Sequence, residues 1–254
     1  MPVDFVRQLG LLDPRQIGNR SVTLVGVGAT GSHAAWYIAH LGWGNTAQNA
    51  GIMKVFDHDV VENHNLANQI YEPEHIGIPK VEALQKMIRR KFGFDIVAKQ
   101  QLVTDQRNEV SANYIFLLTD SMASRLEIFE KCLRLSFKTD LVIETRMGLR
   151  DGRVYAFNPN DPTHVDEWKK TLYRDEDVPV ASACRASESI ISTVTYLASM
   201  AVSRLVQHFN CTYGNDTLRD GSNPMKMWNE LHFSLYPEAM MLRQFGSRTE
   251  PIIF

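Results

Sequence analysis

The residues best suited to chemistry in this chain are three glycines in one turn and an acid that follows the next apolar run. Gly26, Gly28 and Gly31 lie between the apolar run Val22–Val25 and a helical pattern. Glycines in such a turn let backbone N–H groups approach a phosphate, and the N-terminus of the following helix favours an anion. The next apolar run ends on Asp57, where a carboxylate can accept hydrogen bonds from ribose hydroxyls. This order of features predicts a nucleotide-binding βαβ unit.

A polar loop, DHDVVENHNLANQ, follows that second apolar run and spans residues 57–69. It leaves the carboxyl end of a predicted strand, which is where ligands bind in open α/β sheets. A dehydrogenase needs one acid at this place, whereas this loop also offers Asp59, Asn65 and Asn68. The density of hydrogen-bonding groups therefore indicates contacts to phosphates and a metal, although a solvated loop is the alternative for its histidines.

Two charged residues further along the chain fit the same chemistry. Lys80 begins a helical pattern, where a cation is locally unfavourable, so a phosphate-binding role is plausible beside that of an ordinary solvated lysine. Asp120 ends a short apolar run, and a carboxylate near bound phosphates is a natural ligand for Mg²⁺. Arg125, five residues later, is equally compatible with a structural and a functional role.

The elements that would position these residues alternate between strands and helices. Strands are predicted at 22–25, 52–56, 96–103, 114–118, 141–143 and 153–157, and helices at 32–41, 80–91, 125–135 and 189–209, with a helix and turn within residues 1–20. Such alternation predicts an α/β fold with a parallel sheet. Residues 158–183 are polar and contain proline, and we predict that they form a long crossing loop.

Composition is that of an ordinary globular protein. The 254 residues are 44% hydrophobic and carry a net charge of -2, which offers no general basic field for nucleic acid. The three cysteines are far apart, so neither a disulfide framework nor a cysteine-rich zinc site is expected. The sequence has no run of transmembrane length, and its acid-bearing N-terminus does not look like a signal peptide. We expect a cytoplasmic protein.

The ordered motifs GVGATGS, DHDVVENHNLANQ, GIPKVEAL and TDSMASR resemble those of the ThiF/MoeB/HesA family, whose members are related to ubiquitin-activating enzymes. The resemblance covers roughly residues 4–210. It implies a Rossmann-like nucleotide-binding fold, with a mostly parallel central sheet flanked by helices. It also implies a single adenylating domain over 1–254, made of a nucleotide-binding half (about 1–157), a crossing loop (about 158–188) and a C-terminal helix and tail (189–254).

The resemblance further implies an enzyme that uses ATP and Mg²⁺ to attach AMP to the C-terminal carboxylate of a small ubiquitin-like or sulfur-carrier protein. Arg7 matches an arginine that reaches the partner's active site, so a homodimer is expected; a membrane or nucleic-acid partner is not. Carried over by position, the nucleotide-binding residues are Gly26, Gly28, Gly31, Asp57, Asp59, Asn65, Asn68 and Lys80, the Mg²⁺ ligand is Asp120, and the catalytic residues are Arg7, Lys80, Asp120 and Cys184.

Cys184 matches a cysteine that receives the activated acyl group in related proteins. Arg185 beside it and a nearby helix start could lower the pKa of the thiol, which would increase its nucleophilicity. An inert, buried thiol is an equally good interpretation, since free cysteines are often buried.

The chain departs from the family pattern in three places. Asn68 replaces the arginine of the NLxRQ motif, and Arg7, Arg15 or Arg146 could compensate for it. The paired CxxC zinc motifs of many relatives are absent, and the loop 42–51 is longer than the corresponding turn.

Alternative functions follow from these departures. The same fold could act on a peptide, a small molecule or a tRNA base. The missing arginine motivates a further alternative, a non-catalytic partner subunit. An NAD-dependent dehydrogenase rests on the glycine turn alone and ranks last.

Overall fold

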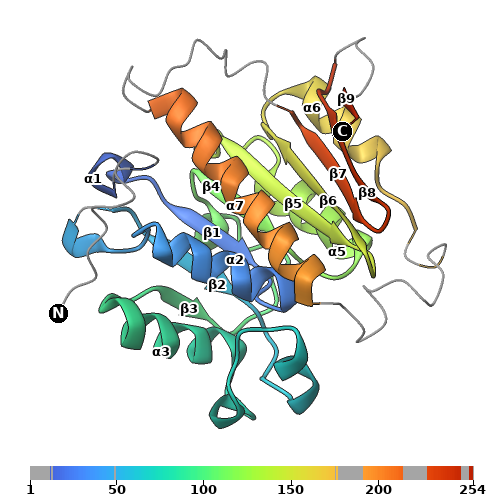
Figure 1. Ribbon diagram of the computed structural model, residues 1–254. Helices are drawn as coiled ribbons and strands as arrows, with labels where there is room; N and C mark the ends of the chain where they lie inside the picture. Colours follow the sequence, from blue (N-terminus) through green and yellow to red (C-terminus); the bar gives the residue numbers. More distant parts are fainter. Residues whose placement is uncertain are drawn as a thin grey trace.

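The computed structural model describes residues 12, 14–48, 50–174, 176, 191–213, 228–246 and 252–253 (Figure 1). These residues form one mixed sheet with helices on both of its faces. The strands are β1 (Val22–Val25), β2 (Met53–Phe56), β3 (Val97–Lys99), β4 (Tyr114–Leu117), β5 (Leu141–Met147), β6 (Asp151–Phe157), β7 (Glu230–Leu235), β8 (Glu238–Arg243) and β9 (Ile252–Ile253). The helices are α1 (Pro14–Ile17), α2 (Ala29–His40), α3 (Lys80–Phe92), α4 (Arg107–Val110), α5 (Met122–Ile128), α6 (Pro162–Lys170) and α7 (Ile191–Tyr213).

The strand order β3-β2-β1-β4-β5-β6-β7-β8-β9 divides the sheet into a parallel part and an antiparallel part. Neighbouring strands from β3 to β5 are parallel, and those from β5 to β9 are antiparallel. Chain order reverses between β1 and β4, because β2 and β3 lie on one side of β1 and β4 on the other. Such a switch point opens a crevice at the carboxyl ends of the strands, where open α/β sheets bind ligands.

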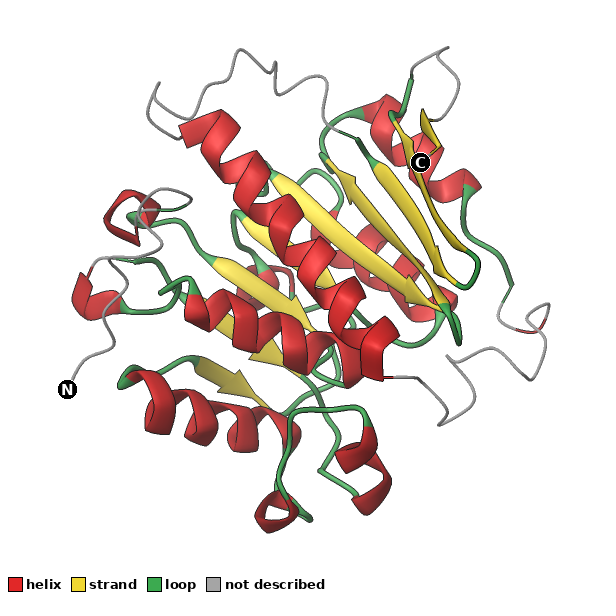
Figure 2. Ribbon diagram, in the orientation of Figure 1, coloured by secondary structure: helices red, strands yellow, loops and turns green. Residues whose placement is uncertain are grey.

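Successive side chains of a strand point to opposite faces, and β5 shows both faces clearly. Ile143 packs in the core that includes residues of α2, α3 and α7, whereas Val142 packs in a second core with Phe129 and Trp168. Figure 2 shows helices on both faces of the sheet. Both faces are buried, which explains why the central strands are continuous apolar runs.

The glycine turn is closed by contacts too short for any side chain. A Cβ atom on Gly31 would lie 2.1 Å from the carbonyl oxygen of Gly26, and one on Gly26 would lie 2.7 Å from that of Leu118. Helix α2 starts at Ala29, inside the glycine motif, rather than at Ser32 as predicted. Gly28, which caps this helix, lines the crevice.

The prediction of an unbroken crossing loop after β6 is wrong, because Pro162–Lys170 form α6. The Asp161 side chain caps this helix by accepting hydrogen bonds from the N–H groups of Thr163 and His164, at 2.8 and 3.2 Å. Proline follows at the first helical position, and fully buried Trp168 anchors the helix to the sheet. An acid followed by proline is a recognised helix-start signal that the polarity of the segment concealed.

Other boundaries differ by a few residues. α5 begins at Met122, three residues before the predicted start, and a π-helical turn (Phe129–Leu133) follows it. β3 is limited to three residues of the predicted 96–103, and β5 and β6 are longer than predicted. Strands β7 and β8, in the predicted tail, were not expected.

The long loop after α2 is folded back onto the core. Trp43 is fully buried, and its indole N–H donates to the carbonyl of Arg20 at 2.9 Å. The extra residues therefore pack beside β1 and leave the glycine turn undisturbed. Within the described part of the chain, no helix combines the length and the apolar character needed to cross a bilayer.

Candidate functional site

Asp57 is oriented by the glycine turn across from it. Its Oδ2 atom accepts the N–H of Val27 at 2.8 Å, and its Oδ1 atom accepts the N–H of Asp59 at 3.0 Å. Tyr71 supports the same turn from the buried side, where its hydroxyl donates to the Val27 carbonyl at 2.7 Å. Burial, and then the nearby carboxylates, raise the pKa of Tyr71, so it stays a neutral donor. The turn and the acid are therefore held as one preformed surface.

Lys80 lies beside this surface and pairs with Asp59. Its ammonium is 2.8 Å from Asp59 Oδ2, and its side chain is 8% exposed, against 49% for the aspartate. His58 Nε2 lies 3.3 Å from the other oxygen of Asp59. The helix-start lysine thus has a carboxylate partner at the rim of the crevice, and an arriving phosphate would compete with Asp59 for its ammonium.

Asp120 reaches the crevice from the loop after β4. The Ser124 hydroxyl donates to Thr119 Oγ1 at 2.8 Å, and the Ser121 side chain caps α5 by accepting the Ser124 N–H at 3.1 Å. Arg125 also holds this loop in place, because its guanidinium donates two hydrogen bonds to the Thr119 carbonyl. Arg125 is 3% exposed and does not line the cavity, so it holds this loop from the buried side and makes no direct contact with a ligand there.

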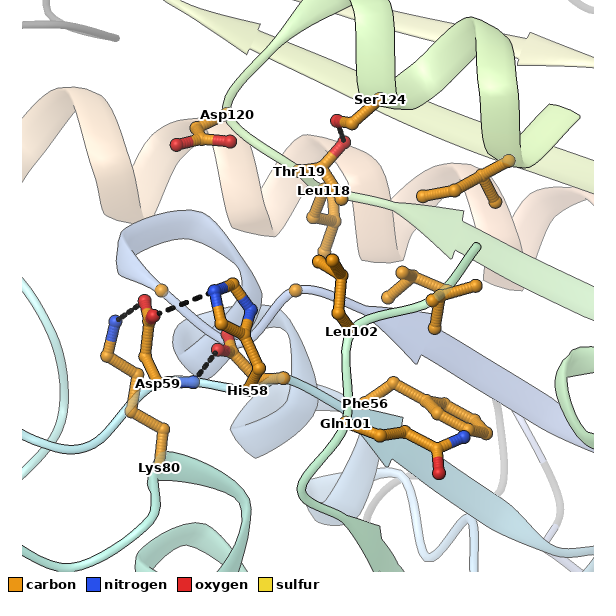
Figure 3. A pocket seen from close by; sticks show the side chains of 16 residues that line it. Phe56, His58, Asp59, Lys80, Gln101, Leu102, Leu118, Thr119, Asp120 and Ser124 are labelled. Carbon is orange, nitrogen blue, oxygen red and sulfur yellow. Dashed lines mark hydrogen bonds and ion pairs between the residues drawn. The ribbon is translucent and has the colours of Figure 1, made fainter. Parts of the chain in front are cut away.

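A cavity of about 250 Å³ joins these groups at the carboxyl ends of β1, β2 and β4 (Figure 3). Figure 3 shows Asp120 on one wall and the Asp59–Lys80 pair on another. The lining residues are Val25, Gly26, Gly28, Phe56, Asp57, His58, Asp59, Lys80, Gln101, Leu102, Val103, Leu118, Thr119, Asp120, Ser124 and Ile128. Figure 3 shows the charged side chains of Asp59, Lys80 and Asp120 on one side of the cavity and those of Phe56 and Leu102 on the other, which suits a ligand with a charged end and a flat apolar end.

The charges of the lining fit a phosphate ligand only with further cations. Three lining residues are aspartates and one is a lysine, Lys80, so the lining has more negative than positive charge. Asp57, His58 and Asp59 each have an atom that could bind a metal, and these three atoms lie within 4.8 Å of one another. Asp59, however, is already paired with Lys80. Exposed Asp120 has a carboxylate that faces the cavity. Since Mg²⁺ commonly uses one or two carboxylates and otherwise water and phosphate oxygens, Asp120 fits that ion.

Other predicted residues lie elsewhere. Asn65 is buried and caps its own turn, where its Oδ1 accepts the Glu62 N–H at 2.8 Å. Asn68 ends that turn and is not among the lining residues of the cavity. Their phosphate contacts stay predictions. Arg7, the side chain of Arg15, and Cys184 lie outside the described residues.

Cys132 and Cys211, the cysteines of the described part, lie away from the cavity. Cys132 is buried, and burial raises the pKa of its thiol, so it is not poised as a nucleophile. Cys211 is in α7 and is partly exposed. Neither residue lines the cavity.

Sequence reasoning missed a buried ion cluster beneath the Asp120 loop. Glu144 of β5 accepts hydrogen bonds from Arg125, Arg146 and Trp168. Because Arg146 is 5% exposed and engaged in this cluster, it is not available to replace the missing arginine in the cavity. The signal was a carboxylate inside the apolar run LVIETRM, which demands buried cationic partners.

Comparison with known proteins finds matches over most of the chain. A family model, the ThiF family, matches residues 4–239. The chain is 26% identical over 222 residues to the sulfur carrier protein ThiS adenylyltransferase of Escherichia coli K12, covering 83% of this chain and 80% of that protein. It is 32% identical over 146 residues to the adenylyltransferase and sulfurtransferase MOCS3 of Arabidopsis thaliana, covering 55% of this chain and 29% of that one.

The fold is also found among solved structures. The crystal structure of E. coli MccB with ATP superposes with a TM-score of 0.63 at 13% identity. The match covers 92% of this chain and 66% of MccB, so this chain spans less than two thirds of that protein and of the plant relative. The expected Rossmann-like α/β fold, with a parallel central sheet between helices, is confirmed, and the antiparallel strands β6 to β9 extend that sheet on one side. With the family model matching nearly its whole length, the chain belongs to the ThiF family.

Proposed function

We propose that this protein is an ATP-dependent adenylyltransferase that activates a C-terminal carboxylate. One observation carries the proposal: Asp57, Lys80 and Asp120 meet the glycine turn in a single cavity at the switch point of the sheet. Asp57 has free lone pairs for a ribose, Lys80 provides a cation and Asp120 a metal ligand. Phe56, Leu102 and Leu118 provide an apolar surface for a base.

The substrate proposed first is a small sulfur-carrier or ubiquitin-like protein. The match to the E. coli relative whose name states this activity covers 80% of that protein. A peptide is the second candidate, because solved structures with this fold include MccB with MccA. Both substrates present the same reacting group, a carboxylate at a chain end.

The reaction joins that carboxylate to AMP. A carboxylate oxygen attacks the α-phosphorus of ATP, the bond to the β-phosphate oxygen breaks, and pyrophosphate leaves. Negative charge grows on the leaving group, and cations placed in advance stabilise it. Lys80 is positioned to hold phosphate oxygens and the glycine turn to donate N–H groups. Mg²⁺ held by Asp120 would neutralise phosphate charge.

Cys184 is proposed as the next acceptor of the acyl group. Its thiolate would attack the acyl carbon of the adenylate, and AMP would leave with the electron pair of the broken C–O bond. A thioester would result. Replacing Cys184 by Ser should abolish a thiol-sensitive conjugate while adenylation continues.

Exchange of labelled pyrophosphate into ATP tests the proposal. With a carrier protein ending in Gly-Gly, or a peptide ending in a free carboxylate, the chain should catalyse exchange that depends on Mg²⁺. Asp120→Asn should reduce it by about a hundredfold or more, with unchanged thermal stability because Asp120 is exposed. ATP binding without exchange on any carboxylate would instead support a non-catalytic partner subunit. Preferential NADH binding would revive the dehydrogenase.

A further inference from the structure

A buried ion cluster lies between the Asp120 loop and the segment after α6, which is residues 171–174. Glu144 in β5 is fully buried, and Arg125 and Arg146 are 3% and 5% exposed. All three side chains lie on the sheet face that Trp168 covers. A buried carboxylate is costly unless cations and hydrogen bonds compensate it, so the arrangement of its donors is well defined.

One arm of the cluster runs toward the cavity. Arg125 Nη1 donates to Glu144 Oε1 at 2.5 Å. The Nε and Nη2 atoms of the same guanidinium donate to the carbonyl of Thr119, with the Nε bond at 2.9 Å. Thr119 immediately precedes Asp120, and both residues line the cavity. The arm therefore fixes the backbone from which the carboxylate of Asp120 projects.

The other arm runs away from the cavity. Arg146 donates from Nη2 to Glu144 Oε2 at 2.9 Å. It also donates to the carbonyl of Thr171 at 2.6 Å and to its hydroxyl at 2.9 Å. Thr171 ends α6 and is followed by Tyr173, whose ring centroid lies 5.7 Å from the Arg146 guanidinium. In the sequence, this segment leads to Cys184.

Glu144 joins the two arms because each of its oxygens accepts more than one donor. Oε1 accepts from Arg125 and Arg146, and Oε2 accepts from Arg146 and Trp168. Burial alone would raise the pKa of Glu144, but the charges of Arg125 and Arg146, with hydrogen bonds from Arg146 and Trp168, lower it below its usual range. The carboxylate is thus charged at neutral pH.

We propose that Glu144 is a positioning residue, which through Arg125 and Arg146 holds the Thr119–Asp120 loop and the segment after α6 as one unit. The functional part of this inference rests on the proposed nucleotide site. A substitution that disturbs the Thr119–Asp120 loop then also disturbs the segment after α6, and the reverse holds. The placement of Asp120 therefore depends on the contacts of Arg146 with Thr171.

Hydrogen exchange of the free protein tests the coupling without any ligand. The readouts are the amides of Ser124 and Arg125 on one arm and of Thr171 and Leu172 on the other, all of which are hydrogen-bonded. In Glu144→Gln an NH₂ group must face at least one of the former donors, so exchange should rise about tenfold at both pairs. Arg146→Lys keeps the charge but cannot bridge Glu144 and Thr171, and it should also raise exchange at Ser124 and Arg125.

Asp140→Asn is the matched control. Asp140 accepts hydrogen bonds from Asn113 and Tyr213 just before the start of β5, at the amino ends of the parallel strands, whereas the cavity lies at their carboxyl ends. This control should leave exchange at both amide pairs unchanged. If Arg146→Lys loosens Thr171 and Leu172 while Ser124 and Arg125 keep wild-type exchange, the arms are independent and the proposal is overturned. This variant decides the matter even where Glu144→Gln fails to fold.

Nucleotide titration then tests the functional part. Glu144→Gln or Arg146→Lys should weaken binding of a non-hydrolysable ATP analogue about tenfold with Mg²⁺ present. With EDTA, the affinity should match that of wild type. An equal loss under both conditions would contradict positioning of Asp120. If wild type binds no nucleotide, the proposed function fails, whereas the exchange experiment still decides whether the two segments are coupled.

Discussion

The three glycines of the turn differ in what they do, although their residue type is the same. Gly26 has a φ of 95°, and a Cβ atom there would meet the Leu118 backbone; a Cβ atom on Gly31 would meet the Gly26 backbone. Gly28 has a negative φ and lines the cavity, and a Cβ atom there would meet no other atom within 4 Å. Two glycines are thus required by the fold, whereas the third borders open space in the cavity.

Substitutions by alanine should separate these roles. Gly28→Ala should fold with a melting temperature close to that of wild type, because the methyl group enters open space. It should weaken ATP binding about tenfold or more, because the methyl group occupies the approach to the N-terminus of α2. Gly31→Ala should lower the free energy of unfolding by about 3 kcal/mol through overpacking against backbone. Calorimetry and urea denaturation measure the two effects.

The opposite pattern would contradict this assignment. If Gly28→Ala binds ATP as wild type does, the phosphates do not approach the turn at this residue. A stable Gly31→Ala would show that the contact with Gly26 can relax.

At the scale of elements, α7 contains a titratable group that should make the fold sensitive to acid. His208 lies 3.4 Å from the Tyr114 hydroxyl, with its ring edge-on to that of the tyrosine. Burial, together with nearby Arg204, lowers the pKa of His208 to about 4. The folded state therefore disfavours the protonated imidazole, whereas the unfolded chain binds the proton near pH 6.5.

Stability should consequently fall as the pH is lowered from about 6.5 to about 4, because the unfolded state binds more protons over this window. His208 should contribute a loss of about 3 kcal/mol over the window, since one pKa unit corresponds to about 1.4 kcal/mol. His208→Gln should make the pH dependence of the free energy of unfolding shallower, as measured by urea denaturation at each pH. Identical slopes for variant and wild type would contradict burial of this ring.

How much of the structure could be predicted from the sequence depended on whether a signal was local. The helix predicted at 80–91 matches α3 because its apolar stripe and its end at Gly93 are local features. Strands β7 and β8 were not predicted because β7 is defined by pairing with distant β6, and β8 by pairing with β7. α6 was missed because a polar composition outweighed its capping residues.

The same distinction applies to the site. Asp57, Lys80 and Asp120 follow strands or begin a helix, so topology alone places them at the carboxyl ends of the parallel strands. The Glu144 cluster depends on which helix covers which face of the sheet, and no local pattern contains that information. Asn65 shows the converse case, in which a motif residue is engaged in capping its own turn.

At the scale of the whole molecule, the expected homodimer can be tested through function. If Arg7 serves the partner's site, Arg7→Ala and Asp120→Asn are each inactive, but a mixed dimer has one site that contains neither change. Co-expression of the two variants should restore about a quarter of wild-type exchange activity, because half of randomly formed dimers are mixed and each has one intact site. Light scattering on the same sample measures the oligomeric state.

Activity that stays at the level of the single variants in a sample that is dimeric would contradict a role of Arg7 in trans. A monomer with full activity would contradict the dimer itself.

The edge strand β3 has a consequence for how such molecules associate. It spans three residues, from half-exposed Val97 to Lys99, whose ammonium lies 3.4 Å from Glu109. Short edge strands that end in charged side chains resist pairing with strands of other molecules, which protects a protein against aggregation. When copies of this chain associate, β3 should therefore stay exposed to solvent, and no continuous sheet should form between two molecules through this strand.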